Sequence, residues 1–120
     1  RRYENAVERR SQIWAADVEF HQQLAEASGN VVFTRVLAAL GDLLELYRRV
    51  TDRVPGAPEQ AVIEHTAIVK AIEARDTEAA RRAMESHLHT AMQSVAEGLS
   101  MQLQTLPSPA DRGPSAPDHD

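Results

Sequence analysis

Apolar residues recur at steps of three and four along most of the chain, which is the period of one face of an α-helix. Short breaking segments divide this pattern into four predicted helices, over residues 1–28, 31–53, 59–74 and 77–104. Gly29-Asn30 and the run from Pro55 to Pro58 separate the first three, since glycine, asparagine and proline favour turns over helix. Asp76 is the expected N-cap of the fourth helix, and Ser11 is a candidate cap for a new start within the first.

The composition agrees with an all-α fold. Hydrophobic residues make up 42% of the chain but aromatic residues only 4%, so the core must consist mainly of Ala, Leu, Val, Ile and Met, as in a helical bundle. A length of 120 residues fits one domain. We therefore predict an antiparallel bundle of about four long helices over residues 1–104. Several Pro and Gly residues follow in a short polar stretch, so residues 105–120 are expected to form a disordered tail.

Charge and residue usage exclude several classes of protein. The net charge of −5 argues against direct binding of a nucleic-acid backbone by this chain. The absence of cysteine excludes disulfides and thiolate metal sites. No stretch approaches the roughly 18 apolar residues of a membrane span, and no signal-peptide pattern is present, so we expect a cytoplasmic protein without membrane contact. Because Arg1 is not an initiator methionine, we interpret the chain as a fragment or processed piece.

Two residues of metal-ligating types interrupt the apolar face of the first predicted helix. Asp17 lies four residues after Ile13 and three before Phe20, which both belong to that face. His21 lies four residues after Asp17 and three before Leu24, so the two polar side chains share the face. An aspartate among apolar residues is costly unless a positive group meets it. A buried Asp–His hydrogen bond is the simpler interpretation of this pair taken alone.

Each of the last two predicted helices carries one more inward histidine. His65 precedes Ile68 by three residues, which places it on the inner face of the third helix. His87 lies three residues after Met84 on the inner face of the fourth helix. His89 is about 200° away around the same helix and is expected to face solvent. Taken singly, an inward histidine is more often a satisfied core residue than a ligand.

Together the four inward residues indicate a metal site. They come from three predicted helices and are Asp17, His21, His65 and His87. Imidazole nitrogen and carboxylate oxygen are ligands for a divalent transition metal, and such sites are built between facing helices in the interior of bundles. Zn, Ni, Mn or Fe would fit this set of ligands. Zinc is the first choice, although the residue types alone do not select one metal.

Several short motifs follow one another between Trp14 and Leu99. They are Asp17-Val18-Glu19-Phe20-His21, Ala27-Ser28-Gly29-Asn30, Glu64-His65, Ala71-Ile72, Asp76, Ala79-Ala80, Met84 and His87-Leu88. In this order they resemble the FadR C-terminal (FCD) domain of GntR-family bacterial transcription regulators, over about two-thirds of the chain. The Asp and His pair, followed by two histidines 22 residues apart, is the most specific part of the resemblance.

The resemblance implies a ligand-sensing domain in which one aspartate and three histidines hold a divalent cation. Carried over position by position, the implied ligands are Asp17, His21, His65 and His87. In this branch of the family the cation helps to bind a small carboxylate effector. Three arginines are candidates for contact with the effector carboxylate, although solvated positions are the simpler expectation for them: Arg35, Arg48 and Arg49.

The resemblance also implies partners for the whole regulator. We expect a homodimer that contacts DNA only through a winged-helix domain, and no such domain is present in these 120 residues. The sensing domain of the family begins one or two helices earlier, so the helical domain over residues 1–104 is expected to be incomplete at its N-terminus.

Two other classes of function remain open from the residues themselves. A metalloenzyme of this shape, such as a hydrolase that uses metal-bound water, needs a general base, and the helical pattern places no Glu or further His on an inner face. A purely structural metal site needs four protein ligands and no open coordination position. We therefore expect a sensor rather than an enzyme.

Overall fold

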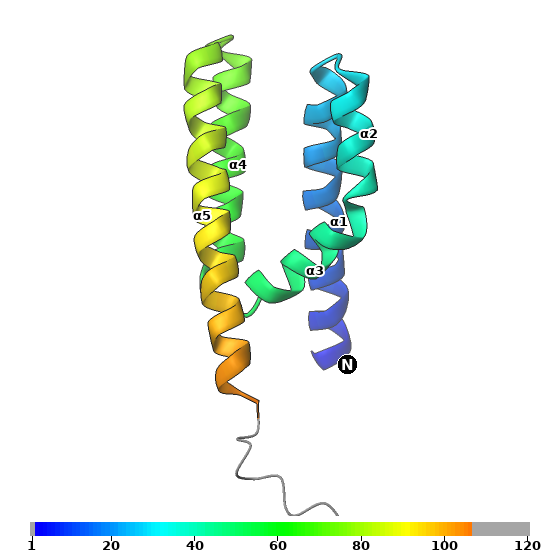
Figure 1. Ribbon diagram of the computed structural model, residues 1–120, viewed down its shortest axis with the longest axis vertical. Helices are drawn as coiled ribbons and strands as arrows, with labels where there is room; N and C mark the ends of the chain where they lie inside the picture. Colours follow the sequence, from blue (N-terminus) through cyan, green and yellow to red (C-terminus); the bar gives the residue numbers. More distant parts are fainter. Residues whose placement is uncertain (1, 107–120) are drawn as a thin grey trace, which may run out of the picture. The chain divides into compact units, whose positions relative to one another are not determined.

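The computed structural model describes the backbone of residues 2–106 and the side chains of residue 9 and residues 11–106. This part of the chain forms five α-helices and no strand, which confirms the all-α class (Figure 1). The helices are α1 (Arg2–Ala27), α2 (Val31–Ala39), α3 (Gly41–Thr51), α4 (Ala57–Glu73) and α5 (Thr77–Gln104). None of them combines the length and the apolar run that a membrane-spanning helix needs. Most of the predicted tail, residues 107–120, lies outside the described residues.

The described residues fall into two compact units that divide between Arg49 and Val50, near the end of α3. In the first unit α1 packs against α2, and in the second α4 packs against α5 (Figure 1). Each pair is a helical hairpin closed by a short turn, so its two helices run antiparallel.

The first hairpin turns at Gly29 and Asn30. Before this turn α1 runs without a break through Ser11, so the new start considered there does not occur. The helix ends where predicted because Gly29 adopts the left-handed conformation, with φ at 68°. Asn30 has a different role from the predicted one. Its backbone is extended, and its side-chain Oδ1 accepts hydrogen bonds from the N–H groups of Val32 and Phe33 at 3.1 and 3.3 Å, so it caps the start of α2.

The single helix predicted over residues 31–53 is wrong, because the chain breaks at Leu40 into α2 and α3. The Leu40 N–H still donates to preceding carbonyl groups, but its ψ of 4° ends the helix. Gly41 follows, and a glycine inside a helix costs about 1 kcal/mol relative to alanine. The break also places Asp42 in the first turn of α3, where the helix dipole favours a carboxylate.

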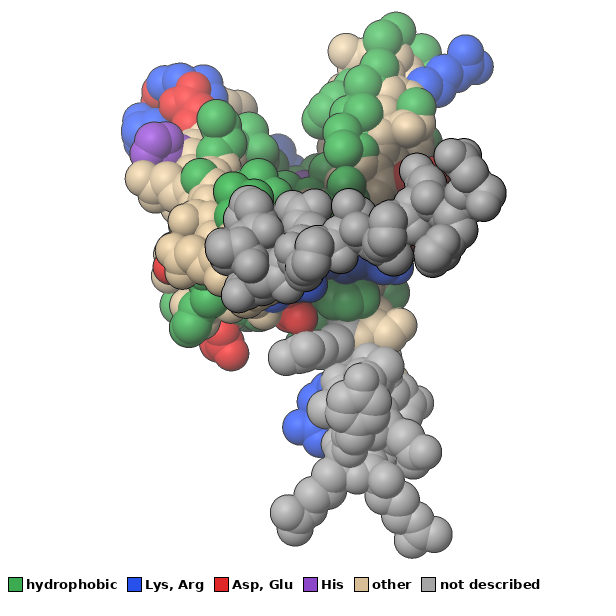
Figure 2. All heavy atoms as spheres, turned by 60° about the horizontal axis from the view of Figure 1, so that its bottom comes forward, with side chains coloured by type: hydrophobic (Ala, Val, Ile, Leu, Met, Phe, Trp, Pro, Cys, Tyr) green, Lys and Arg blue, Asp and Glu red, His purple; other side chains and the backbone are tan. Residues whose placement is uncertain are grey.

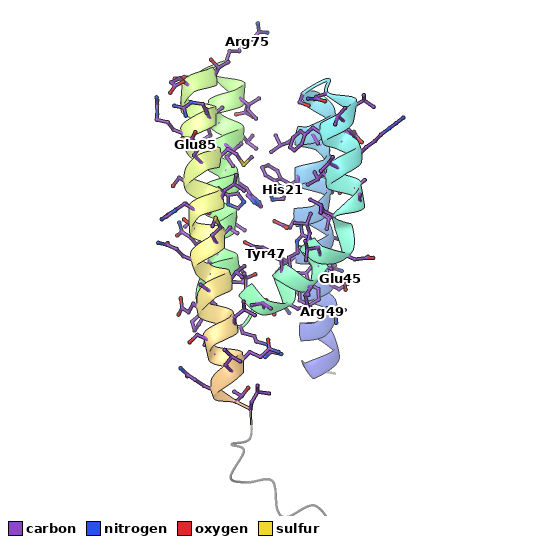
Figure 3. All side chains as sticks on the ribbon, viewed as in Figure 1. His21, Glu45, Tyr47, Arg49, Arg75 and Glu85 are labelled. Atoms are coloured by element: carbon purple, nitrogen blue, oxygen red, sulfur yellow. The ribbon has the colours of Figure 1, made fainter. Side chains whose placement is uncertain are left out.

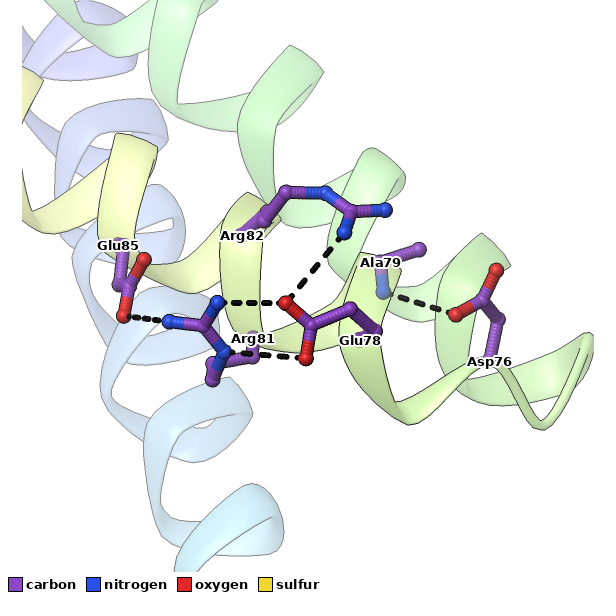
Figure 4. A network of polar contacts seen from close by, with 6 residues as sticks. All are labelled: Asp76, Glu78, Ala79, Arg81, Arg82 and Glu85. Carbon is purple, nitrogen blue, oxygen red and sulfur yellow. Dashed lines mark hydrogen bonds and ion pairs between the residues drawn. The ribbon is translucent and has the colours of Figure 1, made fainter.

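The second hairpin turns at Arg75 and Asp76. Arg75 is left-handed, with φ at 55°, and the Asp76 N–H donates to the carbonyl of Ala71 at 3.0 Å, which closes the end of α4. Asp76 then caps α5 as predicted, since its Oδ1 accepts from the N–H of Ala79 at 2.9 Å (Figure 4). The bounds of α5 agree with the predicted range, and α4 begins two residues before its predicted start, directly after Gly56.

A mixed-charge network covers the first turns of α5 (Figure 4). Arg81 bridges Glu78 and Glu85 with two contacts of 2.5 Å, and Arg82 lies 3.4 Å from Glu78. All four side chains are more than half exposed. Ion pairs of this kind on an exposed helix face contribute little to stability, so this face of α5 is a solvated one.

In the second unit the last turn of α3 meets α5 beside the packed pair of α4 and α5. Val50, Val54 and Ile68 are buried, and Ile68 is only 2% exposed. A Cβ atom added to Gly98 of α5 would lie 2.5 Å from the carbonyl oxygen of Val50 and 2.8 Å from its Cγ1. The absence of a side chain at Gly98 therefore permits this close approach.

The predicted inner faces of the helices are only partly buried. Ala25 of α1 is fully buried, whereas Ile13 on the same helix is half exposed. On α4, Ile68 is buried but Val62 is 61% exposed and Ile72 is also exposed. Apolar side chains reach the surface of each unit (Figure 2). The physical reason is that a hairpin of two helices buries only the stripe along its seam, so a broad apolar face extends beyond it.

Candidate functional site

Two of the predicted ligands face each other across the seam of the second unit. His65 projects from α4 and His87 from α5, and their Nε2 atoms are 3.3 Å apart. The two rings meet edge to face, with centroids 4.6 Å apart. His87 is only 7% exposed, which confirms that it lies on the inner face of α5. His89 is exposed and its Nε2 lies 3.2 Å from the side-chain amide of Gln93, so the predicted separation of inner and outer histidines is correct.

The spacing of the two imidazoles fits chelation of one metal ion. Two nitrogens bound to a tetrahedral zinc ion at about 2.0–2.1 Å lie about 3.3 Å apart. The Nε2 atoms of His65 and His87 have this separation already. The same distance suits a hydrogen bond in which one of the two imidazole nitrogens donates to the other. Donor type and geometry therefore both fit a divalent transition metal.

A carboxylate contacts the ring nitrogen of His87 that does not face His65. Glu64 of α4 places its Oε2 2.8 Å from Nδ1 of His87, on the side of the ring opposite Nε2. Its Oε1 accepts a hydrogen bond of 2.9 Å from the side-chain amide of Gln60, one turn earlier on α4. Burial acts to raise the pKa of Glu64, but hydrogen bonds from Gln60, His87 and Thr90 outweigh it and leave the pKa lowered. Glu64 is therefore an anion at neutral pH.

Glu64 is the residue that the sequence analysis missed. The expectation that no glutamate lies on an inner face is wrong, since the Glu64 side chain is only 11% exposed. The signal was present in the helical period, because Glu64 lies four residues before the buried Ile68. Its contact with His87, however, joins residues 23 positions apart on two helices, which no local pattern reveals.

The other two predicted ligands lie together in the first unit. His21 and Asp17 stand one turn apart on α1, and Nε2 of His21 lies 3.8 Å from Oδ1 of Asp17. Both side chains are about a fifth to a quarter exposed. The ring of Phe20 meets the His21 ring edge to face at 5.2 Å between centroids. Figure 3 shows His21 projecting from the C-terminal half of α1.

A positive group does meet Asp17, and it comes from α3. Nε of Arg48 donates a hydrogen bond to Oδ2 of Asp17, and Arg48 is almost fully buried. The simpler expectation that all three candidate arginines are solvated is therefore wrong for Arg48. It holds for Arg35, which is exposed on α2, and for Arg49, which pairs at 2.6 Å with the exposed Glu45 (Figure 3).

Comparison with known proteins places these residues in a family. The family model of the FCD domain matches residues 1–90. Over 88 residues, or 67% of this chain, the sequence is 39% identical to the HTH-type transcriptional repressor NanR of Cronobacter sakazakii. Over 89 residues, or 68% of this chain, it is 37% identical to a protein of Escherichia coli strain K12 described as an L-lactate dehydrogenase operon regulatory protein.

The matched segments cover 32% and 34% of these two relatives, so the chain spans about a third of their length. No solved structure matches the chain. The names of both relatives are those of regulators of transcription and not of enzymes, in agreement with the sequence analysis. Because the family model covers most of the chain, this protein belongs to the FCD domain family.

Proposed function

We propose that the chain is the ligand-sensing domain of a GntR-type transcription regulator, and that it binds one divalent metal and a small carboxylate. The observation that carries this proposal is the His65–His87 pair, which presents two nitrogens at chelating distance in the FCD family context. In the whole regulator, DNA would be bound by a winged-helix domain outside this chain. Homodimerisation and a cytoplasmic location belong to the same proposal.

The proposed ligands come two from each unit. Asp17 and His21 share one face of α1, and His65 and His87 face each other between α4 and α5. Neither pair alone supplies the three or four protein ligands that a transition metal site requires. We therefore propose, as the sequence and the family resemblance imply, that Asp17, His21, His65 and His87 all bind one ion. Zinc is the first choice for three imidazoles and one carboxylate, and Ni, Mn and Fe are compatible with the same set.

The metal, when bound, supplies a Lewis-acidic centre that accepts an anionic oxygen from the effector. Arg48 is the best placed of the candidate arginines to contact the effector carboxylate, because its guanidinium lies against the proposed ligand Asp17. Arg35 and Arg49 are exposed and are weaker candidates. An arginine with its planar set of donors suits carboxylate recognition.

Regulation would follow from linkage between effector binding and the arrangement of the sensing domain and the DNA-binding domain, or of two subunits. An effector that completes the coordination of the ion would bind best to one such arrangement and shift the population towards it.

The test is a thermal-unfolding screen with small carboxylates on zinc-loaded and zinc-stripped protein. Lactate is the first probe, because the name of one relative refers to the L-lactate dehydrogenase operon. We expect an active carboxylate to raise the Tm of the zinc-loaded protein by several degrees at about 100 times its Kd, and to change the stripped protein much less. Equal shifts in both forms would show that the metal does not anchor the effector. A zinc-loaded protein that responds to no carboxylate would favour a purely structural metal site.

A further inference from the structure

The two ring nitrogens of His87 have different hydrogen-bonding partners, and this difference indicates which nitrogen can bind a metal. Nδ1 lies 2.8 Å from Oε2 of Glu64, whereas Nε2 lies 3.3 Å from Nε2 of His65. A carboxylate can only accept a hydrogen bond, so Nδ1 of His87 must carry the proton. In a neutral imidazole the other nitrogen then has the lone pair. Nε2 of His87 is thereby the atom available to a metal.

Glu64 is itself held in place for this contact. Its Oε1 is occupied by the amide of Gln60 at 2.9 Å, so Oε2 is the oxygen left facing His87. The side chain is 11% exposed, and the contact is therefore shielded from competing water. Gln60 and Glu64 stand on consecutive turns of α4, and this places the whole support on one rigid element.

We infer that Glu64 is the positioning residue that selects Nε2 of His87 as a metal-binding atom and fixes the orientation of its ring. This inference rests on the proposed metal site. Histidine ligands to metals commonly donate their second ring N–H to a carboxylate, which fixes the tautomer and makes the imidazole a stronger ligand. Here the tautomer is set before any ion arrives, because the Glu64–His87 contact needs no metal.

The tautomer is measurable in the metal-free protein. Long-range ¹H–¹⁵N correlation NMR of the full 120-residue chain, stripped with a chelator, distinguishes a protonated from an unprotonated ring nitrogen. We expect His87 to be protonated at Nδ1 and unprotonated at Nε2 in the wild type. In Glu64→Ala we expect the Nε2–H form to become the major one. A wild-type His87 protonated mainly at Nε2 would overturn the inference whether or not the protein binds metal.

The second readout is zinc affinity, determined by competition with a chromophoric chelator at neutral pH. Glu64→Gln keeps the size of the side chain and removes its charge, and Glu64→Asp keeps the charge on a shorter arm. We expect Glu64→Gln to weaken zinc binding about 10–100-fold, with partial recovery in Glu64→Asp. Glu59→Gln is the matched control, since Glu59 is exposed on the same helix, and it should bind zinc as the wild type does.

These measurements separate the inference from the proposed function. A wild type that binds no zinc would refute the metal site, while the tautomer of His87 would still report on Glu64. A wild type that binds zinc, with Glu64→Gln within twofold of it, would refute the positioning role alone. Far-UV circular dichroism of each variant shows whether the hairpin of α4 and α5 remains folded, and Glu64→Gln serves as the readable variant if Glu64→Ala unfolds.

Discussion

The two units each hold one pair of proposed metal ligands, and the pairs are in different electrostatic states. In the second unit a carboxylate, Glu64, supports the His65–His87 pair and leaves the facing Nε2 atoms at chelating distance. In the first unit the carboxylate is itself a proposed ligand, and the buried Arg48 already neutralises it. The second pair is thus prepared to receive a cation, whereas the first already has one. A metal must therefore share Asp17 with Arg48 or displace it.

The largest effect should come from removing either histidine of the His65–His87 pair, which we call the prepared pair because its Nε2 atoms already lie at chelating distance. We expect His65→Ala or His87→Ala to reduce bound zinc from about one ion per chain to nearly none, because the two imidazoles held at chelating distance are then lost as a pair. His21→Ala should weaken zinc binding less, since the prepared pair persists. Elemental analysis after dialysis measures all three. His89→Ala is the control, because His89 is exposed on the same helix as His87. Equal loss in His89→Ala would contradict the assignment of inner and outer faces.

The next largest effect concerns Arg48, the cation that is paired with Asp17 in the first unit. We expect Arg48→Met to lower the free energy of unfolding of zinc-free protein by about 1–3 kcal/mol, because it leaves a partly buried Asp17 without its cation. Zinc should then stabilise this variant more than it stabilises the wild type. Urea titrations with and without zinc measure the loss of stability in the zinc-free variant and the gain in stability on zinc binding. Arg49→Met, which breaks an exposed pair, should change stability by less than about 1 kcal/mol. A zinc-induced gain in Arg48→Met no larger than that of the wild type would contradict competition for Asp17.

The next prediction concerns the close packing of α3 against α5 at Gly98, in the same unit as the prepared pair. Stability should be sensitive to a side chain added at this position. We expect Gly98→Ala to cost about 1–3 kcal/mol, since its Cβ would lie 2.5 Å from the backbone oxygen of Val50 and force a shift of α3 or α5. Gly41→Ala is the matched control, because nothing lies within 4 Å of its added Cβ and alanine favours helix. Denaturant unfolding compares the two. A neutral Gly98→Ala would show that the contact between α3 and α5 is loose.

The smallest expected effect is a difference in acid sensitivity. The folded state lowers the pKa of Glu64, so its contribution to stability is present above the unfolded value of about 4.3 and is lost as pH falls through the folded pKa. Stability of the zinc-free wild type should therefore decline with acid in this range more steeply than that of Glu64→Gln. Urea unfolding between about pH 6 and 3 gives the two slopes. Parallel curves would mean that Glu64 is not stabilised as an anion.

Local patterns in the sequence were sufficient for much of the fold. The bounds of α5, the cap at Asp76 and the opposite faces of His87 and His89 follow from helical period and capping chemistry, which act within a few residues. The break at Leu40 was missed, because the apolar stripe continues across it and hid the cost of Gly41 inside a helix. The helical period of apolar residues also led to an overestimate of burial, because it gives the direction of a side chain but not what covers it. Val62, which was predicted to face inward, is exposed.

The polar partners at the candidate site depend on pairings that lie far apart in the sequence. The period directed Asp17 and His87 inward, but it did not indicate that Arg48 or Glu64 would meet them. Those contacts span 31 and 23 residues and arise only when α3 packs near α1 and α4 against α5. Residue types therefore predicted the candidate ligands, and packing supplied the groups that neutralise or orient them.

The most direct test of the central claim is zinc K-edge X-ray absorption spectroscopy of the zinc-loaded protein. If Asp17, His21, His65 and His87 all bind one ion, the spectrum should show three imidazoles and oxygen ligands at about 2.0–2.2 Å. The imidazole count should fall to two in His21→Ala. A wild-type ion with two imidazoles or fewer, unchanged in His21→Ala, would contradict binding by all four residues and restrict metal binding to the hairpin of α4 and α5.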